Sequence, residues 1–512
     1  MCIILVALST ISNANEPVRL RIASPSDPES VDPYVQLSSH VLAVSHLLYD
    51  PLVRFPQDRK LQPMLATSWK QVDPTTYLIE IRKGVTFHSG NPLTAEDVVW
   101  TINRIKRSLD FKGLFEVVTA EVAGTHTVRI KTSIPYPLTM NIMEFVFPMD
   151  SKFYTGKDEK GRAKDDISKV GTSYPDKFVS GTGPYILAER EPGKRVILKK
   201  NPSYWGVMSK VDEIQLIPIK EEGTRVAALL RGDVDIITPV PIQDYETLKK
   251  NKNIELYTLP TDRVMLFTLK SSKGSPLADK RVREALSLGT NIQGITERIL
   301  QKQAEPIAQF ALPYMSGYDP ELKPRVYNIE RAKELLAEAG YSTKNPLKLT
   351  MIATNDRYIK DEDIVKSFVA MMARIGVQIS LKFFPKAQYW AQYDSTNYDI
   401  ALIGWSTDTK DSLNYGEFLM MTYDEKAGLG AYNAGRYSNA EYDALLKKAK
   451  TELDTQKRHS LIKQSEHLLY DDVAYIPLFL EPISWAARKR VKNLGALVNP
   501  ENFIPYNELI VD

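Results

Sequence analysis

Hydrophobic and polar residues alternate along several short segments, and each such segment predicts a strand with one buried face. The clearest is 76–82, TYLIEIR, which ends at Lys83-Gly84. Further strands are expected over 85–87, 124–131, 196–199, 234–237, 347–353, 377–383 and 400–404. Clusters of turn residues, such as 89–92 and 180–184, separate these strands from the segments around them.

Other segments place apolar residues at helical spacing. Thr94 can cap a helix, Asp97 lies in the first turn, and Val98, Ile102 and Ile105 then form one apolar face. Helices are also expected over 223–230, 279–289, 328–338 and 361–375, with glycines at 340 and 376 ending the last two. The order strand–helix–strand predicts α/β architecture with parallel sheets and right-handed crossovers.

The first 14 residues, MCIILVALSTISNA, carry no charge. An apolar run followed by Ser12 and Ala14 has the form of a secretory signal peptide, with cleavage expected after Ala14. The usual basic start is missing, since the first basic residue is Arg19, and a buried apolar strand is the alternative. The run, about 12 residues, is shorter than the about 20 that span a bilayer. We expect a soluble, exported, periplasmic protein that loses Cys2 with its signal.

Composition narrows the class of protein further. A chain of 512 residues suggests about three domains. Basic and acidic residues, 66 and 63, nearly balance, so no electrostatic footprint for nucleic acid is present. A single cysteine excludes a disulfide framework and a cysteine-based zinc site.

Motifs for catalysis or metal binding are absent. The sequence has no nucleophile elbow, phosphate-binding loop or H-E-x-x-H motif, and Gly181-x-Gly183 lacks the third glycine of a dinucleotide fingerprint. None of the paired histidines has metal-ligand spacing. The six are His40, His46, His88, His126, His459 and His467. We expect no enzyme, no cofactor and no metal.

Several segments together resemble the periplasmic solute-binding proteins of peptide-type ABC importers. This is family 5 of the bacterial extracellular solute-binding proteins, which includes dipeptide, oligopeptide and nickel binders. The most specific segments are 83–90, KGVTFHSG, and 93–98, LTAEDV. Others follow in the family's order: 65–69 LATSW, 181–185 GTGPY, 201–205 NPSYW, 281–286 RVREAL and 475–478 YIPL.

The resemblance implies an α/β, two-lobed periplasmic-binding-protein fold, type II-like and of cluster C, with a hinge and an extra inserted domain. The implied boundaries place the signal peptide at 1–14, a discontinuous lobe I at 15–43, 174–259 and 481–512, the extra domain at 44–173, and lobe II at 260–480. Closure of the lobes around the ligand is then the expected motion.

The resemblance also implies ligand-binding residues. Asp408, in the segment 404–408 GWSTD, matches the aspartate that receives the ligand's ammonium, and Gly404 and Ser406 would pair with the ligand backbone. Arg357 matches an arginine that some dipeptide binders use for the ligand carboxylate. Trp405, Tyr358 and Ser39 complete the expected set.

Each anchor has a second interpretation. Asp408 is also suited to cap a turn, Arg357 to join a structural ion pair and Trp405 to fill the core. The sequence departs from the family after Asp408, where Lys410 and Asp411 change the local charge and the insert 423–437 follows.

A receptor that captures short peptides and delivers them to an ABC permease is therefore the leading prediction, with a monomer expected. The alternatives are a receptor for another polar solute, such as an opine, an oligosaccharide or a metal chelate, and a periplasmic hydrolase or chaperone.

Overall fold

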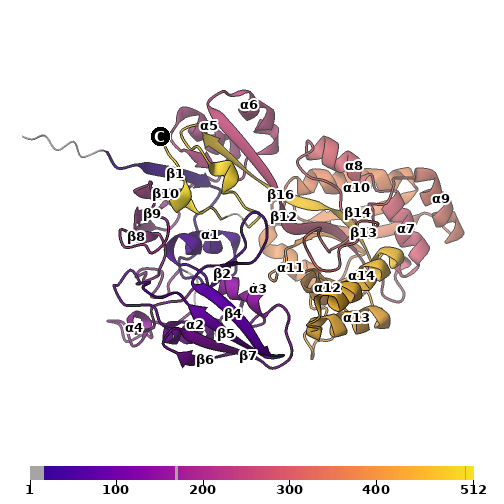
Figure 1. Cartoon of the computed structure of the whole chain (residues 1–512). Helices are drawn as coiled ribbons and strands as arrows, with labels where there is room; N and C mark the ends of the chain where they lie inside the picture. Colours follow the sequence, from indigo (N-terminus) through magenta and orange to yellow (C-terminus); the bar gives the residue numbers. More distant parts are fainter. Residues whose placement is uncertain (1–15, 168–170, 502) are drawn as a thin grey trace, which may run out of the picture.

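A ten-stranded mixed sheet runs through both lobes of the molecule (Figure 1). The computed structural model describes residues 16–167, 171–501 and 503–512, so the predicted signal peptide, 1–14, lies outside it. The strand order is β14 (Val377–Phe383), β13 (Leu347–Ala353), β15 (Ile400–Trp405), β12 (Ile254–Leu269), β16 (Tyr475–Arg488), β11 (Ile236–Ile237), β1 (Arg19–Ser24), β10 (Glu213–Pro218), β9 (Arg195–Lys200) and β8 (Tyr185–Glu191).

Parallel pairs occur where strand–helix–strand order predicts them. In the second lobe β13 pairs in parallel with β14 and β15, and α10 (Asp361–Arg374) connects β13 to β14. In the first lobe β1 pairs in parallel with β10 and β11. Gly376, at φ 86°, reverses the chain after α10 in a backbone conformation that favours glycine. The prediction of parallel sheets is confirmed for these pairs, but the sheet as a whole is mixed, because the strands that join the lobes are antiparallel.

Two long strands, β12 and β16, pass between the lobes as an antiparallel pair. Pro260 and Pro482 face each other where the two strands pass from one lobe to the other, and the register shifts between Pro260 and Val264. Proline has no backbone N–H, so the ladder loses donors on both strands at this point. The pairing is therefore weakest at the junction of the lobes.

A separate antiparallel sheet lies below the first lobe in Figure 1. Its strands, in order, are β4 (Ala66–Asp73), β5 (Thr76–Ile81), β7 (Thr127–Thr132) and β6 (Val118–Gly124), and the short pair β2 (Val53–Arg54) and β3 (Gln62–Pro63) lies beside it. The prediction of one strand over 124–131 is wrong. Gly124 ends β6, and a hairpin turn at Thr125 and His126 leads into β7.

Helix α2 (Ala95–Ile105) covers this sheet and begins as predicted. The Thr94 backbone N–H and hydroxyl donate to Asp97 Oδ2 at 2.9 and 3.0 Å, which caps the first turn. Val98, Ile102 and Ile105 are fully buried. The predicted apolar face of this helix is confirmed.

The inserted region is fixed to the first lobe by a shared core and a buried ion pair. Ile22 of β1, Ile79 of β5, Ile102 of α2 and Trp485 of β16 belong to one hydrophobic cluster. At the end of α2, Arg104 donates from both terminal nitrogens to the two oxygens of Asp32, at 2.8 and 2.6 Å.

The remaining long helices surround the sheet: α1 (Ser39–Leu48), α5 (Glu222–Arg231), α7 (Lys280–Leu288), α9 (Ile329–Glu338), α11 (Lys386–Asp394), α12 (Ser412–Leu419), α13 (Ala440–Thr451) and α14 (Thr455–Asp472). No helix in the described part of the chain is both long and apolar enough to cross a membrane. The predicted lobe boundaries at 259/260 and 480/481 fall within β12 and β16, and the division into domains stays a prediction.

Replacing the buried carboxylate of Asp32 tests the link between the inserted region and the first lobe. Asp32→Asn leaves the Arg104 charge, which is 1% exposed, without its counter-charge, so we expect the free energy of unfolding to fall by about 3 kcal/mol. Urea denaturation measures this loss. Asp165→Asn is the matched control, because Asp165 pairs with a half-exposed Arg107 and should cost less than about 1 kcal/mol. Equal losses would contradict the structural role of the buried pair.

Candidate ligand-binding site

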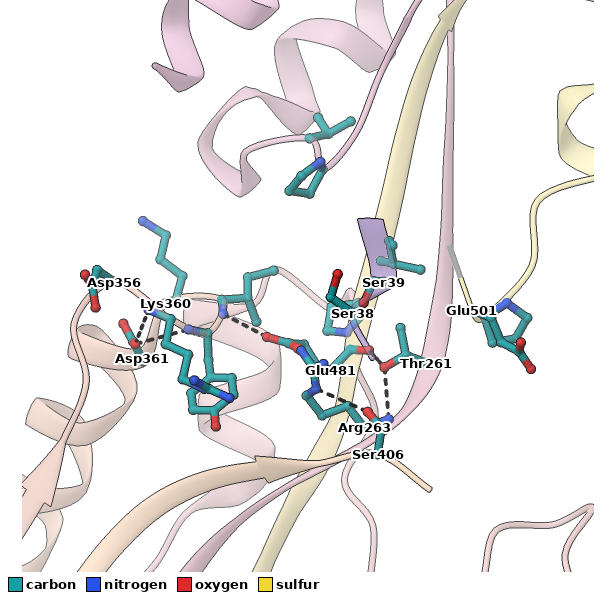
Figure 2. Close-up of a pocket in the computed structure, with 18 of the residues that line it drawn as sticks. Ser38, Ser39, Thr261, Arg263, Asp356, Lys360, Asp361, Ser406, Glu481 and Glu501 are labelled. Atoms are coloured by element: carbon teal, nitrogen blue, oxygen red, sulfur yellow. Dashed lines mark hydrogen bonds and ion pairs between the residues drawn. The ribbon is translucent and has the colours of Figure 1, made fainter. Parts of the chain in front are cut away.

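A cavity of about 760 Å³ lies between the lobes. The volume is in the range of small-molecule sites, about 300–1,000 Å³. Its walls come from the start of α1, from η1 (Met143–Phe145), from the part of β12 and β16 that passes between the lobes, and from two second-lobe segments. These are 355–363, which runs into α10, and the loop 406–410. Figure 2 shows Thr261, Arg263, Ser406 and Glu481 grouped at the crossing strands, with Lys360 to one side and Glu501 to the other.

Where β12 and β16 pass between the lobes, they supply a polar wall whose charged side chains already have partners. Arg263 of β12 donates to Glu481 of β16 at 2.9 Å and to the Ser406 hydroxyl at 3.3 Å. The second oxygen of Glu481 accepts the backbone N–H of Ile359 at 3.0 Å. Arg263 and Glu481 therefore join both hinge strands to the second-lobe loop. Neither residue belongs to a local motif, so sequence patterns could not identify them as part of the cavity wall.

Asp408 lies in the cavity wall as a half-buried carboxylate. It makes no hydrogen bond or ion pair with any residue of the described chain. Burial raises the pKa of Asp408 to about 6, and the nearby Lys410 ammonium opposes this rise. A carboxylate held this way favours a cationic partner.

The turn that follows is closed by other residues, so Asp408 is not needed as its cap. Thr407 Oγ1 donates to the carbonyl of Asp411 at 3.0 Å and accepts the N–H of Thr409 at 3.2 Å. The Asp411 carboxylate caps α12 and accepts two hydrogen bonds from Arg458, both at 2.7 Å. Asp411 is absent from the cavity wall, whereas Lys410 is part of it.

Arg357 also lines the cavity, and its guanidinium has no ion-pair partner in the part of the chain that the structure describes. The guanidinium lies 5.0 Å from the ring of Trp390 and 5.2 Å from that of Tyr358, and its Nε is buried without a hydrogen-bond partner. Asp361 accepts the backbone N–H of Arg357 at 3.1 Å, which orders the loop without neutralising the side chain. The side chain is thus free to bind an anion.

The other predicted residues divide into two groups. Ser39, Tyr358 and Ser406 line the cavity with Asp408 and Arg357, whereas Gly404 and Trp405 are outside its wall. A Cβ at Gly404 would come within 2.6 Å of Met265 Sδ, so close packing of β15 on β12 requires glycine there.

Trp405 packs behind the cavity. Its ring lies 4.5 Å from that of Tyr432, in the insert 423–437, and its indole N–H donates to Asn414 at 3.4 Å. The predicted ligand contacts of Gly404 and Trp405 stay predictions.

Lys410 joins three separate parts of the chain. Its Nζ lies 2.9 Å from Glu501 Oε1, near the C-terminus, and 3.3 Å from Glu144 Oε1, in η1. Burial and the neighbouring Glu501 carboxylate raise the pKa of Glu144, and burial also raises that of Glu501. Close by, Asn141 donates to the Thr409 carbonyl at 2.7 Å. These contacts hold the second lobe against the inserted region and the first lobe.

A sequence profile of the bacterial extracellular solute-binding proteins, family 5 (middle region), matches residues 60–426. The chain belongs to this family. The resemblance in the sequence motifs is thereby confirmed, and with it the prediction of a solute-binding protein.

Curated relatives match almost the whole chain. The probable D,D-dipeptide-binding periplasmic protein DdpA of Escherichia coli is 26% identical over 497 residues, which cover 94% of this chain and 92% of the relative. The periplasmic murein peptide-binding protein MppA of E. coli is 24% identical over 484 residues, with 88% and 86% coverage.

Solved structures share the two-lobed fold. The substrate-binding protein CtaP of Listeria monocytogenes has a TM-score of 0.84 at 24% identity, covering 97% of this chain and 100% of that one. The periplasmic binding protein DppA of Helicobacter pylori, solved with the peptide STSA, has a TM-score of 0.78 at 23% identity, with 97% and 98% coverage.

The structure describes residues 16–167, 171–501 and 503–512. Among them, no three histidine, cysteine or carboxylate side chains lie together in a way that could hold a metal ion. Asp408 and Arg357 line the cavity with opposite charges and have no ion-pair partner among the described residues, and together they suit an organic zwitterion.

Replacing Lys410 tests the contact between the lobes. In Lys410→Met, the buried Glu144 and the partly buried Glu501 lose their shared cation, so we expect the free energy of unfolding to fall by about 3 kcal/mol near pH 7.5. Both carboxyls have raised pKa values, so protonation relieves their repulsion and the loss should shrink as the pH falls toward 5. Urea denaturation at the two pH values measures this.

The exposed Lys426 provides the control, since Lys426→Met removes a lysine from the same lobe without touching the cavity. A loss for Lys410→Met that is small, or the same at both pH values, would contradict the assigned contact.

Proposed function

We propose that this protein is the substrate-binding receptor of an ABC importer and that it captures short peptides between its lobes. The observation that carries the proposal is the presence of a free carboxylate, Asp408, and a free guanidinium, Arg357, in the wall of one interlobe cavity. A peptide with free ends is a zwitterion and offers one partner to each group.

The chemistry of the anchors favours peptide over uncharged solutes. The ligand ammonium makes charge-assisted hydrogen bonds to Asp408, and Arg357 can hold both oxygens of the C-terminal carboxylate. Ser39, Tyr358 and Ser406 supply further polar groups along the cavity. The hydroxyls of a sugar can form hydrogen bonds with both groups, but they bring no opposite charge to either, so the charge-assisted part of the interaction is missing.

The names of the relatives agree with this choice. D,D-dipeptide binding, murein peptide binding and a bound tetrapeptide appear among them. Relatives named for binding nickel and deoxycholate have similar sequence identity to this chain, 26% and 24%. Deoxycholate has one carboxylate and no cation, so it would bring no positive charge to Asp408.

The remaining assignments follow from the receptor role. We propose that residues 1–14 direct export, that the protein works as a monomer in the periplasm, and that it passes its ligand to the permease of the transporter without chemical change. The proposed division into lobe I, extra domain and lobe II lets closure about β12 and β16 trap the ligand.

Alanine peptides from di- to pentapeptide test the anchors by isothermal titration calorimetry. We expect the best of the series to bind wild-type protein, and Asp408→Asn to weaken it by about tenfold or more, because a charge-assisted hydrogen bond is lost. Acetylation of the peptide's N-terminus should have a similar effect on the wild type. Asp363→Asn is the control, since Asp363 also lines the cavity but is 58% exposed and pairs with Lys360.

Equal binding of free and acetylated peptide would refute the ammonium anchor. Release of free alanine from the peptide by the purified protein would favour the hydrolase instead.

A further inference from the structure

The cavity has more unpaired carboxylate groups than the single N-terminal ammonium of a zwitterionic peptide can bind. Several of its carboxylates already have partners: Asp356 accepts from Lys386 N, Asp361 from Thr354 and three backbone N–H groups, Glu222 from Gln243, and Glu481 from Arg263 and Ile359 N. Two groups in the cavity wall have an acceptor without a hydrogen-bond partner among the described residues and are not exposed: the Asp408 carboxylate and Glu144 Oε2.

Glu144 is a buried carboxylate that is only half satisfied. It is 6% exposed and lines the cavity from η1, and its Oε1 faces Lys410 at 3.3 Å. Its Oε2 is buried and has no hydrogen-bond partner among the described residues. Lys410 lies closer to Glu501, at 2.9 Å, so one ammonium serves two carboxylates.

Glu144 and Asp408 belong to the same end of the cavity. Asn141, one turn before Glu144, donates to the Thr409 carbonyl, directly after Asp408, at 2.7 Å. Lys410 contacts Glu144 and also acts electrostatically on Asp408. This end therefore carries the carboxylates of Glu144, Asp408 and Glu501 against the single ammonium of Lys410.

Among the described residues, Arg59 is a second cation that acts on this end, since it opposes the rise in the pKa of Glu501. Arg59, on the inserted region, is bound to Asp262 and the Tyr314 hydroxyl, so its charge is already matched. His46 is buried, which lowers its pKa to about 3 and keeps the imidazole neutral. The ammonium of a peptide's N-terminus neutralises one excess carboxylate and leaves another.

We propose that Glu144 determines specificity by binding a basic side chain on the first residue of the peptide, whose own ammonium binds Asp408. This inference rests on the proposed function and names the class of peptide. A lysine or arginine side chain brings hydrogen-bond donors and a positive charge to Glu144 Oε2, which completes the pairing of the buried group. An apolar first side chain leaves that oxygen unsatisfied.

A comparison of ligands on the wild-type protein tests this without any variant. The probes have the length of the best alanine peptide and begin with lysine or with norleucine, which has nearly the same shape without the charge. We expect the lysine peptide to bind about tenfold tighter, the effect of one hydrogen bond to a charged group. A peptide with lysine at its second position should show no such gain.

The variant Glu144→Gln assigns the effect to this residue. The preference for lysine over norleucine should fall to about threefold or less, while the norleucine peptide keeps its wild-type affinity. Glu222→Gln is the control, because Glu222 lines the cavity but is exposed and bonded to Gln243, and its preference should not change. If Glu144→Gln is too unstable to assay, the wild-type comparison decides.

Each other result has a distinct meaning. Equal affinities of the wild type for the lysine and norleucine peptides overturn the role of Glu144 and leave the peptide receptor intact. An equal gain from lysine at the second position overturns the assignment to the first residue. Failure of all peptides to bind overturns both the proposed function and this inference.

Discussion

The two strands that pass between the lobes set the geometry on which the site depends. β12 and β16 pair along most of their length, but Pro260 and Pro482 face each other at the crossing and remove backbone donors from the ladder there. The same stretch carries Arg263 and Glu481, which form a wall of the cavity and reach Ser406 and Ile359 of the second lobe. The hinge and the floor of the binding site are thus one structure, so a change in the lobe angle also changes the site.

We propose that the selectivity for charged ligands comes from the burial of unpaired charges in the cavity wall. Some charged groups of the cavity wall form ion pairs with each other, such as Arg263 with Glu481. Asp408 and Arg357 have no ion-pair partner among the described residues. A ligand that brings the matching charges stabilises the closed state by its higher affinity for that state. The contacts of Lys410 with Glu144 and Glu501 act in the same direction, because they form only where the lobes meet.

Local features of the fold could be predicted from the sequence because they depend on neighbouring residues. The strands 347–353 and 377–383 have the bounds of β13 and β14, and the Thr94 cap starts α2. The crossing strands were missed, because β12 is buried on both sides along its second half and shows no alternation there.

The candidate site also has one part that the sequence motifs predict and another part that they do not. The motif around Asp408 and the loop of Arg357 could be matched one at a time, and the structure brings both to one cavity. The cluster of Glu144, Lys410 and Glu501 could not be found, because its members are far apart in the chain and meet only through the packing of the two lobes. Sequence patterns of helical or strand period carry no signal for such contacts.

Native mass spectrometry of the protein purified gently from cells measures the mass of any ligand bound in the cavity. We expect a mixture of adducts with the masses of short peptides, present on the wild type and largely lost from Asp408→Asn. A single adduct with the mass of an oligosaccharide or a metal chelate, retained by Asp408→Asn, would contradict it.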